Sequence, residues 1–131
     1  MVAFYYATTL PYEKSCTHAR HPTVADDWKT EEAEALIDAL LSLEDRAEAE
    51  RFFRDLLTLN ELRDLTLRWN VARLLDQGLH YAEISQRTGA STATITRIAS
   101  WLNHGEGGYR LVLDRLRERG TLPYPTGAVE R

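Results

Sequence analysis

The amino-acid sequence predicts an all-α domain of six helices, and two observations lead to this prediction. Between residues 30 and 120 the apolar side chains recur every three or four residues, which is the spacing of one face of an α-helix. No segment shows the apolar and polar alternation of a half-buried strand. Because residues 1–29 have no sustained period, we expect a poorly ordered N-terminal tail, one helical domain over residues 30–120 and a C-terminal tail over residues 121–131.

Both of the first two helices are predicted from their apolar stripes, and the first also has a residue that can cap its N-terminus. Thr30 can cap the free backbone amides of a first turn, and the glutamates that follow it suit the positive end of a helix dipole. A second helix is expected from about Arg46 to Leu57. The stripes consist of Ala33, Leu36, Ile37, Leu40 and Leu41 in the first helix and of Ala49, Phe52, Phe53, Leu56 and Leu57 in the second.

The third helix has a start signal and a stop signal. Thr58 and Glu61 have the spacing of a capping box, in which each side chain accepts a hydrogen bond from the backbone amide of the other residue. The helix is expected to stop at residues 77–78, a Gln-Gly pair. After a glycine-rich stretch at residues 105–108, the last helix is predicted over residues 109–119.

Residues 80–102 have the spacing of a helix-turn-helix. Two short helices that cross steeply need a small residue where they touch, a glycine where the turn takes a positive φ, and branched apolar residues beneath them. These positions carry Ile84, Ser85, Gly89, Ala90, Ile95 and Ile98. The spacing therefore predicts a unit that reads DNA and accounts for the fourth and fifth helices.

The second helix of this unit is expected to present short, mostly hydroxylated side chains outward. Such a helix can lie deep in a major groove, where threonine methyl groups meet thymine methyl groups and Arg97 reaches a guanine or a phosphate. The alternative is an ordinary αα-hairpin with a polar face, although an exposed face that serves only solubility usually carries Glu and Lys. The candidate DNA-binding residues are Gln86, Arg87, Ser91, Thr92, Ala93, Thr94, Thr96 and Arg97.

The net charge of −4 is divided unevenly along the chain. Residues 30–64 hold eleven acidic residues against four arginines, whereas residues 65–119 hold five acidic residues against eight arginines. A basic second half is expected of a chain whose second half meets phosphate. Acidic helix surfaces are common, however, so the division supports DNA binding without establishing it.

Other kinds of chemistry receive little support. The nearest approach to a metal site is Cys16, His18 and His21 in the N-terminal tail, which lack a fourth ligand, so we expect no metal and no cofactor. No nucleophile, base and orienting acid can be assembled, and we expect no enzymatic activity. The sequence has neither a run long enough to span a membrane nor a signal peptide, and we expect a cytoplasmic protein.

The apolar content of the first two helices predicts a homodimer. Their stripes are as wide as those of core helices, and a small six-helix monomer would struggle to enclose them together with its large aromatic rings. A second copy would share the core and supply the second reading helix that a helix-turn-helix usually needs. The expected interface residues are Leu36, Ile37, Leu40, Leu41, Phe52 and Phe53.

Three segments together resemble the Trp-repressor superfamily, in particular its YerC/YecD-type branch. They are RFFRDLLTLNEL at residues 51–62, TGASTATITR at residues 88–97 and LNHGEGGYRLVLDRL at residues 102–116. The likeness covers about residues 30–119. It implies an intertwined helical homodimer whose first helices embrace the partner, with residues 80–102 as the DNA-reading head.

The resemblance also assigns roles to individual residues. It implies that Thr92, Ala93, Thr94 and Thr96 touch base edges or bridging water, with Arg97 at the end of the reading helix. In tryptophan-responsive members the indole lies between two arginines, which correspond here to Arg68 and Arg97, and the pocket threonine corresponds to Thr58. Where those members have glycine and serine, this chain has Ile98 and Trp101, which we expect to fill the cavity. The resemblance therefore implies a vestigial pocket that does not respond to tryptophan, and use of the site by another small molecule stays open.

Two functions follow from these observations. The preferred one is a dimeric, sequence-specific transcription regulator that binds double-stranded DNA and represses by occlusion. The alternative is a helical protein-interaction module that kept the fold and presents its acidic face to a partner protein.

Overall fold

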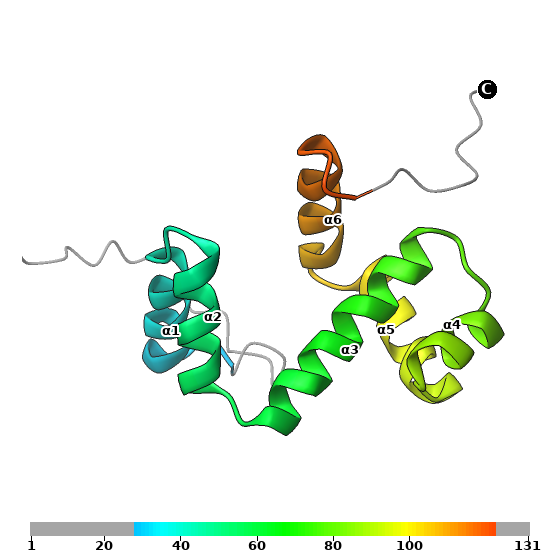
Figure 1. Cartoon of the computed structure of the whole chain (residues 1–131), viewed down its shortest axis with the longest axis horizontal. Coiled ribbons are helices and arrows are strands. Elements are labelled where there is room, and N and C mark those ends of the chain that lie inside the picture. The colour runs from blue at the N-terminus through cyan, green and yellow to red at the C-terminus, as the bar shows by residue number, and fades with distance from the viewer. Residues whose placement is uncertain (1–27, 123–131) are drawn as a thin grey trace, which may run out of the picture. The chain divides into compact units, whose positions relative to one another are not determined.

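The computed structural model describes residues 28–122, and these residues form six helices and no strand (Figure 1). The helices are α1 (Glu31–Leu41), α2 (Arg46–Leu56), α3 (Leu59–Asp76), α4 (Tyr81–Thr88), α5 (Thr92–His104) and α6 (Gly108–Glu118). The prediction of an all-α fold with six helices is confirmed. Most of both expected tails lies outside the described residues, as do Cys16, His18 and His21.

The chain divides into two compact units, the first ending at Leu43 and the second beginning at Glu44. Within the described residues the first unit contains α1. Its N-cap is Thr30, whose hydroxyl accepts a hydrogen bond from the amide of Ala33 at 3.2 Å, as the sequence predicted. No residue of α1 is buried, and Leu41 is 78% exposed. The apolar stripe of this helix is therefore only partly covered.

In the second unit, the predicted capping box begins α3. The amide of Thr58 donates to Glu61 Oε2 at 2.9 Å, and the amide of Glu61 donates to Thr58 Oγ1 at 3.3 Å. The hydrogen bond from the Thr58 amide favours the charged carboxylate and lowers the pKa of Glu61. These bonds fix where α3 starts, and α3 is the longest of the six described helices.

The core of the second unit lies where α4 and α5 pack against α3. The buried residues are Val71 and Ala72 from α3, Ile84 from α4, Ala90 from the turn, and Ile95 and Ile98 from α5. All the positions that the sequence assigned to the inside of a helix-turn-helix are thus apolar and buried, apart from the small Ser85 and the turn glycine. In Figure 1 this head lies at the C-terminal end of α3.

A second cluster attaches α6. Leu113 packs with Leu102 from the end of α5 and with Leu122. Beside this cluster Asp76, whose side chain is 6% exposed, forms ion pairs with Arg110 at 3.2 Å and with Arg117. The hydrogen bond to Asp76 raises the pKa of Arg117. Because Asp76 ends α3, these charges connect α6 to the helix that also supports α4 and α5.

Replacing Ile95 by alanine should destabilise the fold. Ile95 is fully buried between α3, α4 and α5, so its loss removes apolar contacts and leaves a cavity, which costs about 2–5 kcal/mol. Ser100→Ala on the exposed side of the same helix should change stability by less than about 0.5 kcal/mol. Urea unfolding at one fixed protein concentration measures both changes. Equal effects of the two substitutions would show that the core does not lie under α5.

Candidate nucleic-acid interface

The turn between α4 and α5 is held by several local hydrogen bonds. Gly89 adopts a left-handed conformation with φ of 74°, which glycine reaches without strain, and it ends α4. The hydroxyl of Thr88 donates to the carbonyl of Ile84 at 2.7 Å and accepts from the amide of Ala90 at 3.2 Å. Ser91 then caps α5 by accepting from the amide of Thr94. These bonds, together with the core below, determine which face of α5 points outward.

The outward face of α5 holds most of the predicted reading residues. Thr92, Ala93, Thr96 and Arg97 are exposed, and Ser91 is exposed at the cap. Thr94 is half-buried, and its Oγ1 lies 3.0 Å from Ser91 Oγ. The five positions that the spacing leaves outward are thus exposed, whereas Thr94, which only the resemblance assigned to DNA contact, is turned toward the cap.

The hydroxyl groups on this face differ in what they can offer to a ligand. Thr96 Oγ1 donates to the carbonyl of Thr92 at 2.8 Å, so its proton is used within the helix while its lone pair and methyl group stay available. Among the described residues, no hydrogen bond is found for the Thr92 hydroxyl, which can donate or accept. A face that offers methyl groups and hydroxyl acceptors matches the groups that line a major groove.

Charge on the α4–α5 head is sparse and mostly positive. Arg87, one of the two predicted α4 residues, forms an exposed ion pair with Glu83 at 2.5 Å. An exposed pair of this kind contributes little to stability, so a phosphate can compete for the guanidinium. Arg97 has no ion pair among residues 28–122, and Gln86 is exposed. The helix α5 carries no acidic residue.

The residues of the expected corepressor pocket differ in burial. Ile98 is 1% exposed and belongs to the core under the head, whereas Trp101 is 45% exposed. Ile98 thus lies in the core and Trp101 at the surface of the described chain, and that the two fill a corepressor cavity stays a prediction. Side chains three residues apart on a helix differ in direction by about 60°, which is enough to send the second away from the core.

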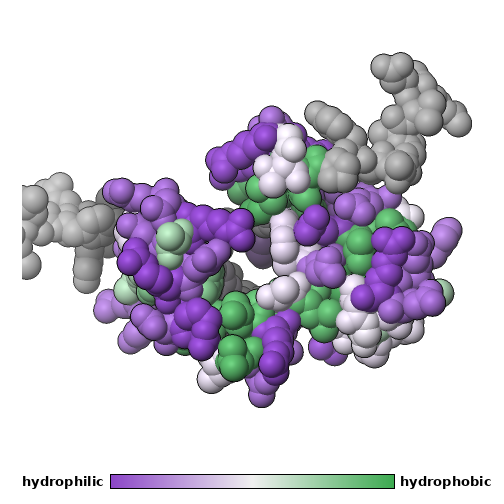
Figure 2. Space-filling model, viewed as in Figure 1, coloured by the Kyte–Doolittle hydropathy of each residue, from purple (hydrophilic) through white to green (hydrophobic). Residues whose placement is uncertain are grey.

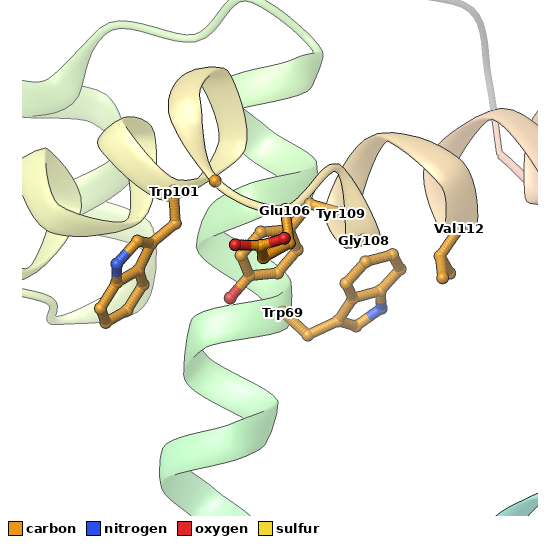
Figure 3. Close-up of a pocket in the computed structure, with 7 residues that line it drawn as sticks. Trp69, Trp101, Glu106, Gly108, Tyr109 and Val112 are labelled. Atoms are coloured by element: carbon orange, nitrogen blue, oxygen red, sulfur yellow. The ribbon is translucent and has the colours of Figure 1, made fainter. Parts of the chain in front are cut away.

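Trp101 instead lines an open hollow of about 740 Å³ between α3, α5 and α6 (Figure 3). Neither Thr58 nor Arg68 nor Arg97 lines this hollow. The Thr58 hydroxyl is engaged with Glu61 in the capping box. The residues that do line it are Trp69, Trp101, Gly105, Glu106, Gly108, Tyr109 and Val112.

Sequence reasoning did not identify this hollow. Trp69 and Tyr109 fall within two of the predicted helices. No local sequence pattern, however, shows that residues forty positions apart lie side by side. Their rings stack with centroids 6.4 Å apart and an interplanar angle of 13°. The spacing of apolar residues predicts on which face of its helix a ring lies. Which residues surround the ring depends on how α6 packs against α3.

The predicted dimer residues lie in both units. Leu36, Ile37, Leu40 and Leu41 are exposed on α1. Phe52 and Phe53 are half-buried on α2, with ring centroids 6.3 Å apart. On the face of the molecule that Figure 2 shows, apolar residues are exposed among the polar ones. Within the second unit, Leu56, Leu59 and Leu65 are exposed as well.

Residues 28–122 show no cluster of His, Cys, Asp and Glu that could hold a metal ion. In the same part of the chain, no helix combines the length and the apolar character that crossing a membrane requires.

Comparison with known proteins gives consistent matches. Residues 31–117 match the family described as Trp repressor protein. The uncharacterized protein YerC of Bacillus subtilis (strain 168) is 45% identical over 96 residues, which is 73% of this chain and 92% of YerC.

Two solved structures share the fold. One is the crystal structure of a candidate Trp repressor from Staphylococcus aureus, with a TM-score of 0.68 and 41% identity over 73% of this chain and 96% of that one. The other is a TrpR-like protein from Eubacterium eligens, with a TM-score of 0.68 and 44% identity over 75% of this chain and 98% of that one. The family match spans five complete helices and nearly all of the sixth, and a relative well above 30% identity agrees with it. The chain therefore belongs to the Trp repressor family.

Proposed function

We propose that this chain is a sequence-specific DNA-binding transcription regulator that uses α4 and α5 as a helix-turn-helix and α5 as the reading helix. The observation that carries the proposal is the exposed face of α5, which combines Thr92, Ala93, Thr96 and Arg97 with no acidic residue. Base contacts made by such short side chains specify sequence, while arginines and helix ends position the protein on phosphate. Membership of the Trp repressor family supports a regulatory role.

We further propose that the active form is a homodimer that represses by occluding DNA. Support comes from the partly exposed stripe of α1 and from the exposed leucines on α2 and α3, because a monomer gains nothing by leaving so much apolar surface in water. A second copy would also provide a second reading helix, and two half-sites give the affinity that one seldom reaches.

Tryptophan is not expected to act as the corepressor. Ile98 is buried in the core under the head, and the resemblance aligns Ile98 and Trp101 with the glycine and serine that leave room for the indole in tryptophan-responsive relatives. Arg68 and Arg97 alone do not make a pocket. The regulator that we propose therefore binds DNA without tryptophan.

Fragments of genomic DNA selected by the protein should define a preferred duplex, and Thr92→Ala or Thr96→Ala should weaken binding to it by about 1–3 kcal/mol. Binding to a random duplex should change little, because these side chains meet bases rather than phosphates. Electrophoretic mobility shift with both duplexes measures the difference.

Thr66→Ala is the matched control, since Thr66 is also exposed and donates its hydroxyl to the carbonyl four residues earlier, on α3. It should leave the ratio of specific to random affinity unchanged. Equal losses on both duplexes for the α5 variants would reject α5 as the reading helix.

Adding L-tryptophan at millimolar concentration should change neither the melting temperature nor the DNA affinity. A ligand stabilises a protein only by binding its folded state, and Ile98 leaves no room for the indole in the core. Thermal unfolding with L-leucine as the control measures this. A rise of several degrees with tryptophan alone would show that a pocket for the indole exists.

Leu40→Asp should break the dimer. The substitution would bury an unpaired carboxylate in the shared core, which costs several kcal/mol. The variant should lose specific DNA binding although its α5 is untouched, because the two half-sites must be held one helical turn apart.

Asp38→Asn on the same helix is the control, since it changes an already polar position. Analytical ultracentrifugation at micromolar concentrations gives the oligomeric state. A wild-type chain that sediments as a monomer, or a Leu40→Asp variant that still dimerises, would contradict the proposed assembly.

A further inference from the structure

Two arginines of α6 share one carboxylate at the end of α3. The guanidinium of Arg110 donates to Asp76 Oδ1 at 3.2 Å, and the guanidinium of Arg117 donates to Asp76 Oδ2. The side chain of Asp76 is 6% exposed and that of Arg117 is 12% exposed. Asp76 is therefore held in place from two sides and is shielded from water.

Arg110 extends this contact to α5. Its Nη1 donates to Asp76, and its Nη2 donates to Asn103 Oδ1 at 2.8 Å. Asn103 lies in the last turn of α5, whose first turns carry the proposed reading residues. One guanidinium thus joins the end of α3 to the end of α5. Because its N–H groups are fixed in one plane, the positions of the two acceptors relative to each other are fixed as well.

The anchoring of Arg110 on Asp76 makes the bond to Asn103 more than an ordinary surface contact. An isolated exposed hydrogen bond contributes little, because water competes for both groups. The Arg110 side chain is 47% exposed, but its pairing with the shielded carboxylate already orders it. The bond to Asn103 therefore requires little further loss of conformational entropy.

The bridge acts where the apolar core leaves α5 least restrained. Ile95 and Ile98 hold the middle of α5 in the core, and a helix held only there can tilt about that contact. At the end of α5, Leu102 is buried and packs with Leu113 of α6. Apolar contact is non-directional, whereas a hydrogen bond has a direction. The Arg110 bridge therefore adds a directional restraint on the axis of α5.

We propose that Arg110 is a positioning residue for DNA recognition, which holds α5 in the orientation that base contacts require by joining Asp76 to Asn103. This inference rests on the proposed function. Base contacts need side chains placed to within about 0.5 Å, whereas binding to random DNA needs only positive charge near phosphate. Arg110 therefore acts on the discrimination between duplexes, and it does so with no small molecule bound.

Asn103→Ala tests this role, because it removes the bond to α5 and leaves Arg110 paired with Asp76. Affinity for the preferred duplex should fall by about threefold to tenfold, which corresponds to one net hydrogen bond. Affinity for a random duplex should change by less than about twofold. Arg110→Lys keeps the charge but loses the planar fork, so it should cause a loss of the same size. The double variant should lose no more than either single one, because both changes break the same bridge.

Fluorescence anisotropy with both duplexes measures the affinities. Urea unfolding at one fixed protein concentration should give the same midpoint for Asn103→Ala as for the wild-type chain, so that a fall in the ratio of specific to random affinity does not come from lost stability. Asn60→Ala is the matched control, since Arg63 donates to Asn60 at 3.4 Å in an exposed bond within α3 alone. It should leave the ratio unchanged.

An unchanged ratio for Asn103→Ala, or losses that add in the double variant, would overturn the role of Arg110. Thr92→Ala separates this result from a failure of the proposed function. If Thr92→Ala lowers the ratio and Asn103→Ala does not, α5 reads DNA and only the role of Arg110 is wrong. If the wild-type chain binds every duplex equally, the proposed function is wrong and the role of Arg110 falls with it.

Discussion

The packing of α4 and α5 onto the C-terminal half of α3 is the constraint on which the rest of the second unit depends. Val71 and Ala72 are fully buried beneath Ile84, Ile95 and Ile98. Close-packed apolar side chains leave little freedom for α5 to rotate about its axis. The same contacts therefore stabilise the unit and determine that Thr92, Thr96 and Arg97 face outward.

Asp76 extends this constraint to α6. Its carboxylate is nearly buried and pairs with two arginines of α6, so α6 is attached to the helix that supports α4 and α5. Removing one partner of a buried pair leaves an uncompensated charge, which is far more costly than losing an exposed pair. The aromatic hollow exists because this attachment brings Tyr109 to Trp69 and leaves Trp101 beside them.

The helix boundaries could be predicted from the sequence because their signals are local. Thr30, Thr58 and Ser91 each accept a hydrogen bond from an amide three residues later, and Gly89 takes the positive φ that its place in the turn requires. The buried face of the head could also be predicted, because its apolar spacing follows from the geometry of two crossing helices.

The remaining features depend on contacts between residues far apart in the sequence. The pairing of Asp76 with Arg117 spans 41 residues, and no periodicity encodes it. The hollow that Trp101 lines also depends on the docking of α6, which the sequence pattern leaves open. Only the resemblance assigned Thr94 to DNA contact, and its half-buried hydroxyl lies against Ser91.

The proposed function requires that α4 and α5 bind DNA. The most direct measurement is the affinity for a random duplex as a function of salt concentration, because each neutralised phosphate releases counterions. If several phosphates are contacted, affinity should fall linearly on logarithmic axes, by about a thousandfold or more between roughly 50 and 200 mM salt. A protein-interaction module that only kept the fold would bind the duplex negligibly even at low salt, or with an affinity that salt does not change, and either result would contradict the account.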